Sequence, residues 1–110
     1  MAHRVREEKG SLVVSFEGDV DLEYAPRARQ VLLESVNQNR DVLVDLSGVS
    51  YIDSSGVANL VEAFQLSRQR GTRFALVSVN AAALRVLELA RLDRVFTIHA
   101  SLEDGLDGVA

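Results

Sequence analysis

Two serines and an acidic residue stand side by side in the segment Asp53–Ser54–Ser55–Gly56, directly before a run with helical periodicity. A serine at such a junction can cap the helix by accepting a hydrogen bond from a free backbone N–H group. The same place suits a phosphate, because the unpaired N–H groups at a helix start carry partial positive charge. The sequence therefore predicts Ser54 as the N-cap and as an exposed hydroxyl whose site can accommodate its own phosphoryl group.

The other residues of this segment allow two interpretations each. Ser55 is interpreted first as a structural residue and second as an alternative phosphorylation site. Asp53 either orients Ser54 and contacts a partner, or caps backbone donors in the loop. Gly56 is expected to leave the first helical turn open to the close approach of another backbone.

Elements on both sides must position this segment. Two strands joined at Gly10 are expected over 3–8 and 11–18, followed by a helix over 25–37 and a strand over 41–46. A helix over 55–70 ends at Gly71, and a strand over 72–79, a helix capped by Asn80, a strand over 94–99 and a helix from Ser101 follow. The order β-β-α-β-α-β-α-β-α predicts an α/β fold with a mostly parallel, mixed sheet layered with helices.

Acidic residues gather near the predicted strand ends. Asp19 and Asp21 follow the second strand, and Asp45 and Asp53 flank the loop after the third. A magnesium site is one interpretation, but solvated loop acids are favoured, because no lysine follows the last strand. A Ser54–His99–Asp hydrolase is kept as a remote alternative, since there is no Gly-x-Ser-x-Gly motif.

Composition sets the broad class of the chain. Its 110 residues predict one domain over 1–110, and the absence of cysteine fits a reducing cytoplasm. The net charge of −4 argues against a broad nucleic-acid-binding face, and no signal peptide or membrane span is expected. No cofactor or metal is predicted.

Three stretches carry a resemblance to a known family. "LSGVSYIDSSGVANLVEAF" resembles the signature loop of STAS domains, typified by anti-sigma factor antagonists, and "EGDVDLEYAP" and "ALRVLELARLDRVFTIHASLEDGL" resemble their earlier acidic stretch and C-terminal third. The resemblance covers essentially the whole chain. It implies the STAS fold and a non-enzymatic partner switch.

The resemblance also implies partners and a phosphorylation site. In that family the unphosphorylated domain binds an anti-sigma factor that is a GHKL-type serine kinase, and phosphorylation of the residue matching Ser54 releases it. A PP2C-type phosphatase resets the switch. The expected partner surface lies on the loops and on the helix face opposite the core stripe, and comprises Asp21, Asp53, Ser54, Ser55, Gly56, Asn59, Glu62 and Leu66.

Two departures from the family pattern bear on the partner. Relatives often carry Gly-Leu-Gly after the hydroxyl pair, whereas this chain has Gly56, Val57 and Ala58. The methyl group of Ala58 would tighten the space at that point. An alternative function is that of the cytoplasmic STAS subunit of an MlaE-type lipid ABC transporter, which would dock on an ATPase without phosphorylation.

Overall fold

The computed structural model describes residues 2–108, so the ends of the predicted 1–110 domain, residue 1 and residues 109–110, lie outside it. The strands are β1 (Ala2–Glu8), β2 (Ser11–Val20), β3 (Val42–Ile52), β4 (Phe74–Val77) and β5 (Thr97–His99). The helices are α1 (Ala25–Val36), α2 (Ser54–Arg70), α3 (Ala81–Leu89) and α4 (Leu102–Leu106), with a short 3-10 helix η1 (Leu92–Arg94). The predicted order of strands and helices is confirmed, with η1 as an addition.

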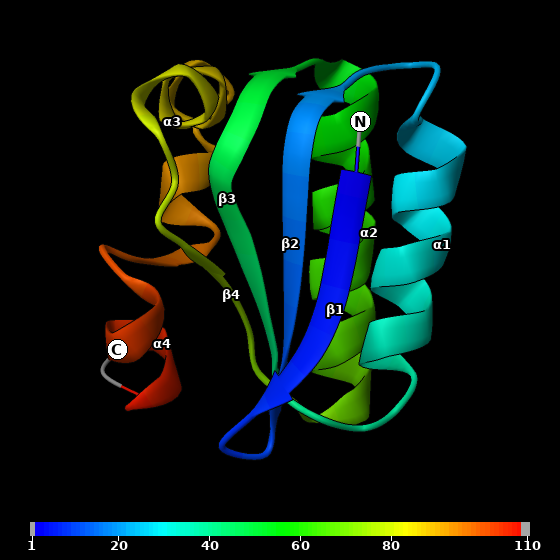
Figure 1. Ribbon diagram of the computed structural model, residues 1–110, viewed down its shortest axis with the longest axis vertical. Coiled ribbons are helices and arrows are strands. Elements are labelled where there is room, and N and C mark those ends of the chain that lie inside the picture. The colour runs from blue at the N-terminus through cyan, green and yellow to red at the C-terminus, as the bar shows by residue number, and fades with distance from the viewer. Residues whose placement is uncertain (1, 109–110) are drawn as a thin grey trace.

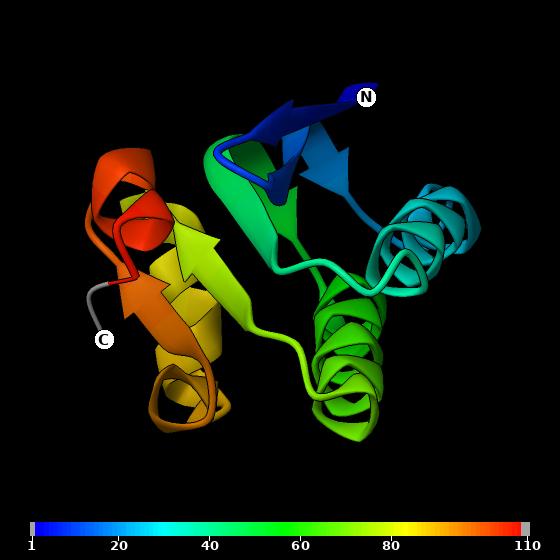
Figure 2. The same cartoon turned by 90° about the horizontal axis from the view of Figure 1, so that it is seen from below.

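The strands form one sheet in the order β1-β2-β3-β4-β5 (Figure 1). The β1–β2 pair is antiparallel, and the other three pairs are parallel. Helices α1, α2 and α3 lie on one face of the sheet, and α4 lies on the other (Figure 2). The three helices that connect parallel strands therefore lie on the same side of the sheet. This follows because every crossover has the same handedness and neighbouring strands are consecutive in the chain.

The core lies between the sheet and helices α1, α2 and α3. Alternate residues of β2, namely Leu12, Val14 and Phe16, contribute to it, as the period of two in a strand requires. The central strand segments 42–44 and 74–77, predicted to be buried, are at most 4% exposed. Their continuous apolar composition therefore reflects burial on both faces of the sheet.

Several predicted caps are present. Gly71 ends α2 in the left-handed conformation, with φ of 74°, and Gly10 has φ of 84° in the β1–β2 turn. The side chain of Asn80 accepts a hydrogen bond from Ala83 N, and Ser101 Oγ accepts one from Asp104 N. These local signals fix the ends of α2, α3 and α4 as predicted.

One strand differs from its prediction. The polar residues after Leu46 were expected to form a loop, but β3 continues to Ile52, and Asp45 lies inside the strand. Asp45 is in a strand, as the predicted range 41–46 has it, but the loop that it was expected to flank is absent. Asp19 was predicted to follow the second strand and lies within β2, so that prediction is wrong. The extended β3 keeps pairing with β2 beyond a register shift, and this pairing holds the polar residues in strand geometry.

Candidate functional site

The β3–α2 junction is organised by the carboxylate of Asp53. Asp53 Oδ1 accepts hydrogen bonds from Ser55 N at 3.0 Å, Gly56 N at 3.2 Å and Ser55 Oγ at 2.5 Å. Asp53 Oδ2 accepts a fourth from Leu22 N, at 3.0 Å, in the β2–α1 loop. One side chain therefore fixes the start of α2 and ties it to the neighbouring loop.

The prediction that Ser54 is the N-cap is wrong. Asp53 holds that position, with an extended backbone (φ −107°, ψ −173°), and Ser54 is the first residue of α2. An aspartate accepts from the first-turn N–H groups at least as well as a serine, and its charge complements the helix dipole. Of the two interpretations of Asp53, the capping of backbone donors is thus the one that the structure shows.

The hydrogen bonds also affect the ionisation of this carboxyl group. The hydroxyl of Ser55 is the main cause that holds the pKa of Asp53 below its ordinary value, and the N–H groups of Gly56, Ser55 and Leu22 act in the same direction. Each donor favours the charged form. Asp53 is therefore an anion at neutral pH, directly beside Ser54.

The two serine hydroxyls differ in what they contact. Ser55 is partly buried and its hydroxyl donates to Asp53. Ser54 is exposed, and within residues 2–108 its side chain forms no hydrogen bond. Of these two serines, only Ser54 has a hydroxyl that is exposed and forms no hydrogen bond within residues 2–108.

The close approach of another backbone that was predicted at Gly56 is present, and it comes from within the chain. A Cβ atom at this position would lie 2.7 Å from Val20 O and 2.8 Å from Ile52 Cγ1. The backbone that approaches Gly56 closely is therefore the end of β2 in the same chain, and Gly56 itself is buried. The glycine allows α2 to start in contact with β2, and it does not leave the turn open.

Asp21 lies in the adjoining loop and shapes the start of α1. Its Oδ1 accepts a hydrogen bond from Tyr24 N at 3.1 Å, and its carbonyl oxygen accepts from Ala25 N at 2.8 Å. The next residue, Leu22, is 74% exposed and donates its N–H to Asp53. Asp21 thus orders the loop that lies beside the α2 start.

Two residues placed by prediction on the outer face of α2 are not there. Asn59 is 8% exposed, and its Nδ2 donates to Ala25 O at 2.8 Å, so it joins α2 to α1. Leu66 is partly buried and packs against the core. The prediction failed because α2 is covered by α1 as well as by the sheet, and two of its faces are therefore buried.

Glu62 is at the edge of the α1–α2 contact. Its carboxylate accepts from Arg29 Nε at 2.7 Å and from Arg29 Nη2 at 2.8 Å, which is a bidentate ion pair. The hydrogen bond to Arg29 holds the pKa of Glu62 below its ordinary value. Glu62 stays accessible from the other side, with 45% of its side chain exposed.

A groove runs from Ser54 along the exposed side of α2. It measures about 500 Å³ and is mostly apolar, and it lies between α2 and α3. Its lining residues are Ser54, Val57, Ala58, Val61, Glu62, Gln65, Val86 and Ala90. The sequence reasoning missed the groove as a surface. Small residues at Ala58 and Ala90 are the signal that would have found it, because they leave space where a larger side chain would fill the gap between the helices.

Two exposed apolar side chains flank the same junction. Tyr51, near the end of β3, is 54% exposed, and Leu22 is 74% exposed. Leu22 donates its N–H to Asp53, and Tyr51 is two residues before Asp53 in the chain, so both belong to the surroundings of the junction. Such a distribution is typical of an interaction surface rather than of a polar active site.

The remote hydrolase alternative is not supported by the geometry. His99 is 6% exposed and belongs to β5, beside α4: its Cδ2 would lie 3.5 Å from a Cβ atom at Gly105. Ser54 starts α2, on the opposite face of the sheet (Figure 2). Within residues 2–108 no three histidine or acidic side chains are arranged to hold a metal ion, and no helix has the length and apolar character needed to span a membrane.

The fold and the site together define an α/β domain with an exposed hydroxyl at the start of its second helix. The family model described as "STAS domain" matches residues 2–105. The chain belongs to the STAS domain family, as the resemblance of the signature loop indicated.

Three similar proteins are all described as anti-sigma factor antagonists. Anti-sigma-F factor antagonist RsfB of Mycobacterium tuberculosis is 31% identical over 96% of this chain and 86% of its own. The anti-sigma-B factor antagonist of Bacillus subtilis is 26% identical over 93% of this chain and 94% of its own. A crystal structure of an anti-sigma factor antagonist from Mycobacterium paratuberculosis superposes with a TM-score of 0.90 at 28% identity, covering 98% of this chain and 92% of that one.

Proposed function

We propose that this protein is an anti-sigma factor antagonist, a cytoplasmic, non-enzymatic partner switch that binds an anti-sigma factor and is released when Ser54 is phosphorylated. The observation that carries the proposal is the difference between the two hydroxyls. Ser54 is exposed and unengaged among the described residues, whereas Ser55 donates to Asp53. The names of the similar proteins support the class of partner.

The partner surface consists of the β3–α2 junction and the groove between α2 and α3. An anti-sigma factor would contact the apolar walls of the groove and the exposed side chains of Leu22 and Tyr51. Asn59 and Leu66 support this surface from inside, since they pack against α1 and the core. Ala58 lies in the groove and is exposed, so its side chain limits how closely a partner helix can approach.

Phosphorylation would gate this surface through charge. A phosphoryl group on Ser54 adds about −1.5 to −2 charges at neutral pH. The N–H groups of Ser55 and Gly56, which would otherwise receive such an anion, already donate to Asp53. The new dianion would therefore stay in water in the free domain and would lose water without a matching cation in a packed complex, which commonly costs several kcal/mol.

The expected loss of binding free energy is large enough for a switch. A loss of about 3 kcal/mol corresponds to a roughly 150-fold weaker complex. In the free domain the helix dipole favours the phosphoryl group by roughly 0.3–2 kcal/mol, while the charge of Asp53 opposes it, so the stability of the domain changes little. In this proposal the kinase is the anti-sigma factor itself, of the GHKL type. A PP2C-type phosphatase removes the phosphoryl group.

The phosphoacceptor is tested by incubating the protein with its cognate anti-sigma factor kinase and ATP. Intact-mass measurement should show one added phosphoryl group, and peptide mass spectrometry should place it on Ser54. Ser54→Ala should remain unmodified, whereas the matched variant Ser55→Ala should still be modified. Full modification of Ser54→Ala would contradict the assignment.

A further inference from the structure

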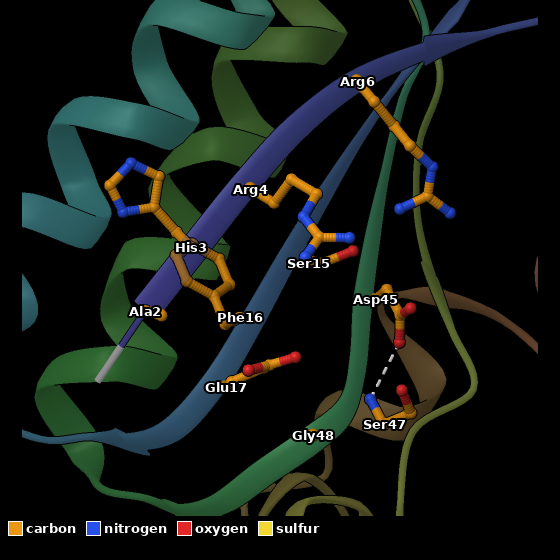
Figure 3. Close-up of a pocket in the computed structure, with 10 residues that line it drawn as sticks. All are labelled: Ala2, His3, Arg4, Arg6, Ser15, Phe16, Glu17, Asp45, Ser47 and Gly48. Atoms are coloured by element: carbon orange, nitrogen blue, oxygen red, sulfur yellow. Dashed lines mark hydrogen bonds between the residues drawn. The ribbon is translucent and has the colours of Figure 1, made fainter.

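The face of the sheet opposite α1 and α2 carries a polar cleft that the proposed function does not use. Among residues 2–108, α4 is the only helix on this face, where it packs on Leu43, Ala75 and Val77 through Leu102 and Leu106. The cleft lies over β1, β2 and β3 and has a volume of about 190 Å³ (Figure 3). Its charged and hydroxyl side chains are Arg4, Arg6, Ser15, Glu17, Asp45 and Ser47. His3 also lines the cleft, but its ring is hydrogen-bonded to the hydroxyl of Tyr24.

A break in the pairing of β2 with β3 opens the cleft. Ser15 pairs with Asp45, but the next pair is Glu17 with Gly48, so three steps along β3 match two along β2. Such bulges bend the strand and redirect side chains, and they are frequent next to binding sites. At Gly48 a Cβ atom would lie 3.0 Å from Glu17 Cγ and 3.3 Å from Phe16 O, so the strands close tightly again at this end.

Opposite charges face each other across the cleft in one row of the sheet. Arg4 pairs with Ser15 on β2, and Ser15 pairs with Asp45 on β3. Two strand spacings separate the backbones of Arg4 and Asp45 by about 9–10 Å. Figure 3 shows the guanidinium group of Arg4 lying over Ser15 and the carboxylate of Asp45 on the opposite wall. Neither side chain forms an ion pair with another residue of 2–108.

A hydroxyl without a partner lies between these charges. Ser15 Oγ is covered from solvent and forms no hydrogen bond with the described residues. A covered hydroxyl is normally satisfied, either by the protein or by a bound molecule. Ser15 can donate to a carboxylate or accept from an ammonium group, so it suits a ligand that brings either one.

The charge balance selects the class of ligand. A simple anion would meet the carboxylates of Asp45 and Glu17, and a simple cation would meet the guanidinium groups of Arg4 and Arg6. A small molecule with both charges pairs with both walls, and the volume fits a molecule of amino-acid size. We propose that this cleft binds a zwitterion of the α-amino acid class, with its carboxylate on Arg4 and its ammonium group on Asp45. The cleft and Ser54 lie on opposite faces of the sheet, so this proposal does not depend on the switch.

Amide chemical shifts of the ¹⁵N-labelled full chain test the proposal. The protein is titrated separately with glycine, L-alanine, L-serine, L-glutamate and L-arginine, and with acetate and methylammonium as ligands of one charge. At least one amino acid should shift the amides of Ser15 and Gly48 saturably, with a dissociation constant of about 1 mM or lower. Acetate and methylammonium should leave these amides unchanged at the same concentration.

Charge-removing variants identify the residues. Asp45→Asn keeps an oxygen that can accept from Ser47 N, the bond that Asp45 Oδ1 now makes at 2.9 Å, and Arg4→Gln changes an exposed residue of the edge strand. Each should weaken amino-acid binding at least about tenfold, because a charge-assisted hydrogen bond is lost. The matched controls Asp93→Asn and Arg94→Gln, at exposed positions of η1, should bind as the native chain does.

Three results would overturn the proposal. The first is the absence of saturable shifts with every amino acid of the panel. The second is equal binding by acetate, with no effect of Asp45→Asn, which would make the cleft an anion site. The third is unchanged amino-acid binding in both variants, which would place the shifts elsewhere.

Discussion

Replacing Gly56 by alanine should destabilise the protein, although alanine is the better helix former. The added Cβ atom would lie 2.7 Å from Val20 O, 2.8 Å from Ile52 Cγ1 and 2.9 Å from Val20 Cγ1. Side-chain rotation cannot relieve the first contact, because Val20 O belongs to the backbone. Either the start of α2 or the end of β2 must therefore move.

The expected cost follows from two opposing effects. Overpacking of this kind costs about 1–3 kcal/mol. The helix propensity of alanine relative to glycine offsets up to about 1 kcal/mol. With an overpacking cost of about 2 kcal/mol, the middle of that range, the net loss of unfolding free energy is about 1–2 kcal/mol. Each kcal/mol lowers the melting temperature of a domain of this size by roughly 4–8 °C.

Urea denaturation followed by circular dichroism, together with calorimetry, measures this change. The reverse substitution Ala58→Gly is the control, because Ala58 is exposed two residues further along the same helix and reports propensity alone. Gly56→Ala should be destabilised, and the same displacement of α2 should weaken binding of the anti-sigma factor. A Gly56→Ala protein as stable as the native chain would refute the close-packing account of Gly56.

Three further predictions concern the same region. Asp53→Asn should lower the urea midpoint at neutral pH. The pKa of Asp53 is held below its ordinary 3.8, so the carboxylate stabilises the fold above that pH, and this stabilisation is lost as the pH falls through the folded pKa. The difference in midpoint between the variant and the native chain should therefore narrow in acid, and a difference that stays constant would argue against this role of the carboxylate. Asn59→Ala removes the buried hydrogen bond from Asn59 Nδ2 to Ala25 O and should cost about 0.5–1.5 kcal/mol in urea unfolding. An unchanged midpoint would show that this bond contributes nothing. Ala58→Arg should fill the groove and weaken anti-sigma factor binding at least about tenfold, measured by titration calorimetry, while the melting temperature stays unchanged. Native affinity of this variant would exclude the groove from the interface.

The order of strands and helices could be predicted because local signals agreed with the tertiary structure. The apolar segments 42–44 and 74–77 are buried on both faces, and Gly71, Asn80 and Ser101 end or begin helices as their types require. The length of β3 could not be predicted in the same way. The polar residues in its second half predict a loop, and only pairing with β2 keeps them in a strand.

The sequence identified the β3–α2 junction as the candidate site, but it did not predict the local geometry there. The cluster of Asp53, Ser54 and Ser55 identified the β3–α2 junction, but either an aspartate or a serine can cap a helix, and only the backbone geometry decides between them. The positions of Asn59 and Leu66 depend on α1 packing against α2, which a single helical stripe does not report. The polar cleft was missed because its residues come from three strands and meet only through the sheet register.

In the proposed switch, the charge on Ser54 controls the affinity for an anti-sigma factor. Titration calorimetry with the cognate anti-sigma factor should compare Ser54→Ala with Ser54→Asp, after differential scanning calorimetry has shown that both melt near the native temperature. Ser54→Ala should bind with near-native affinity, and Ser54→Asp, which carries less charge than a phosphoserine, should bind at least about tenfold more weakly. Equal affinity of the two variants would contradict a phosphate-gated switch and would favour the transporter-subunit alternative.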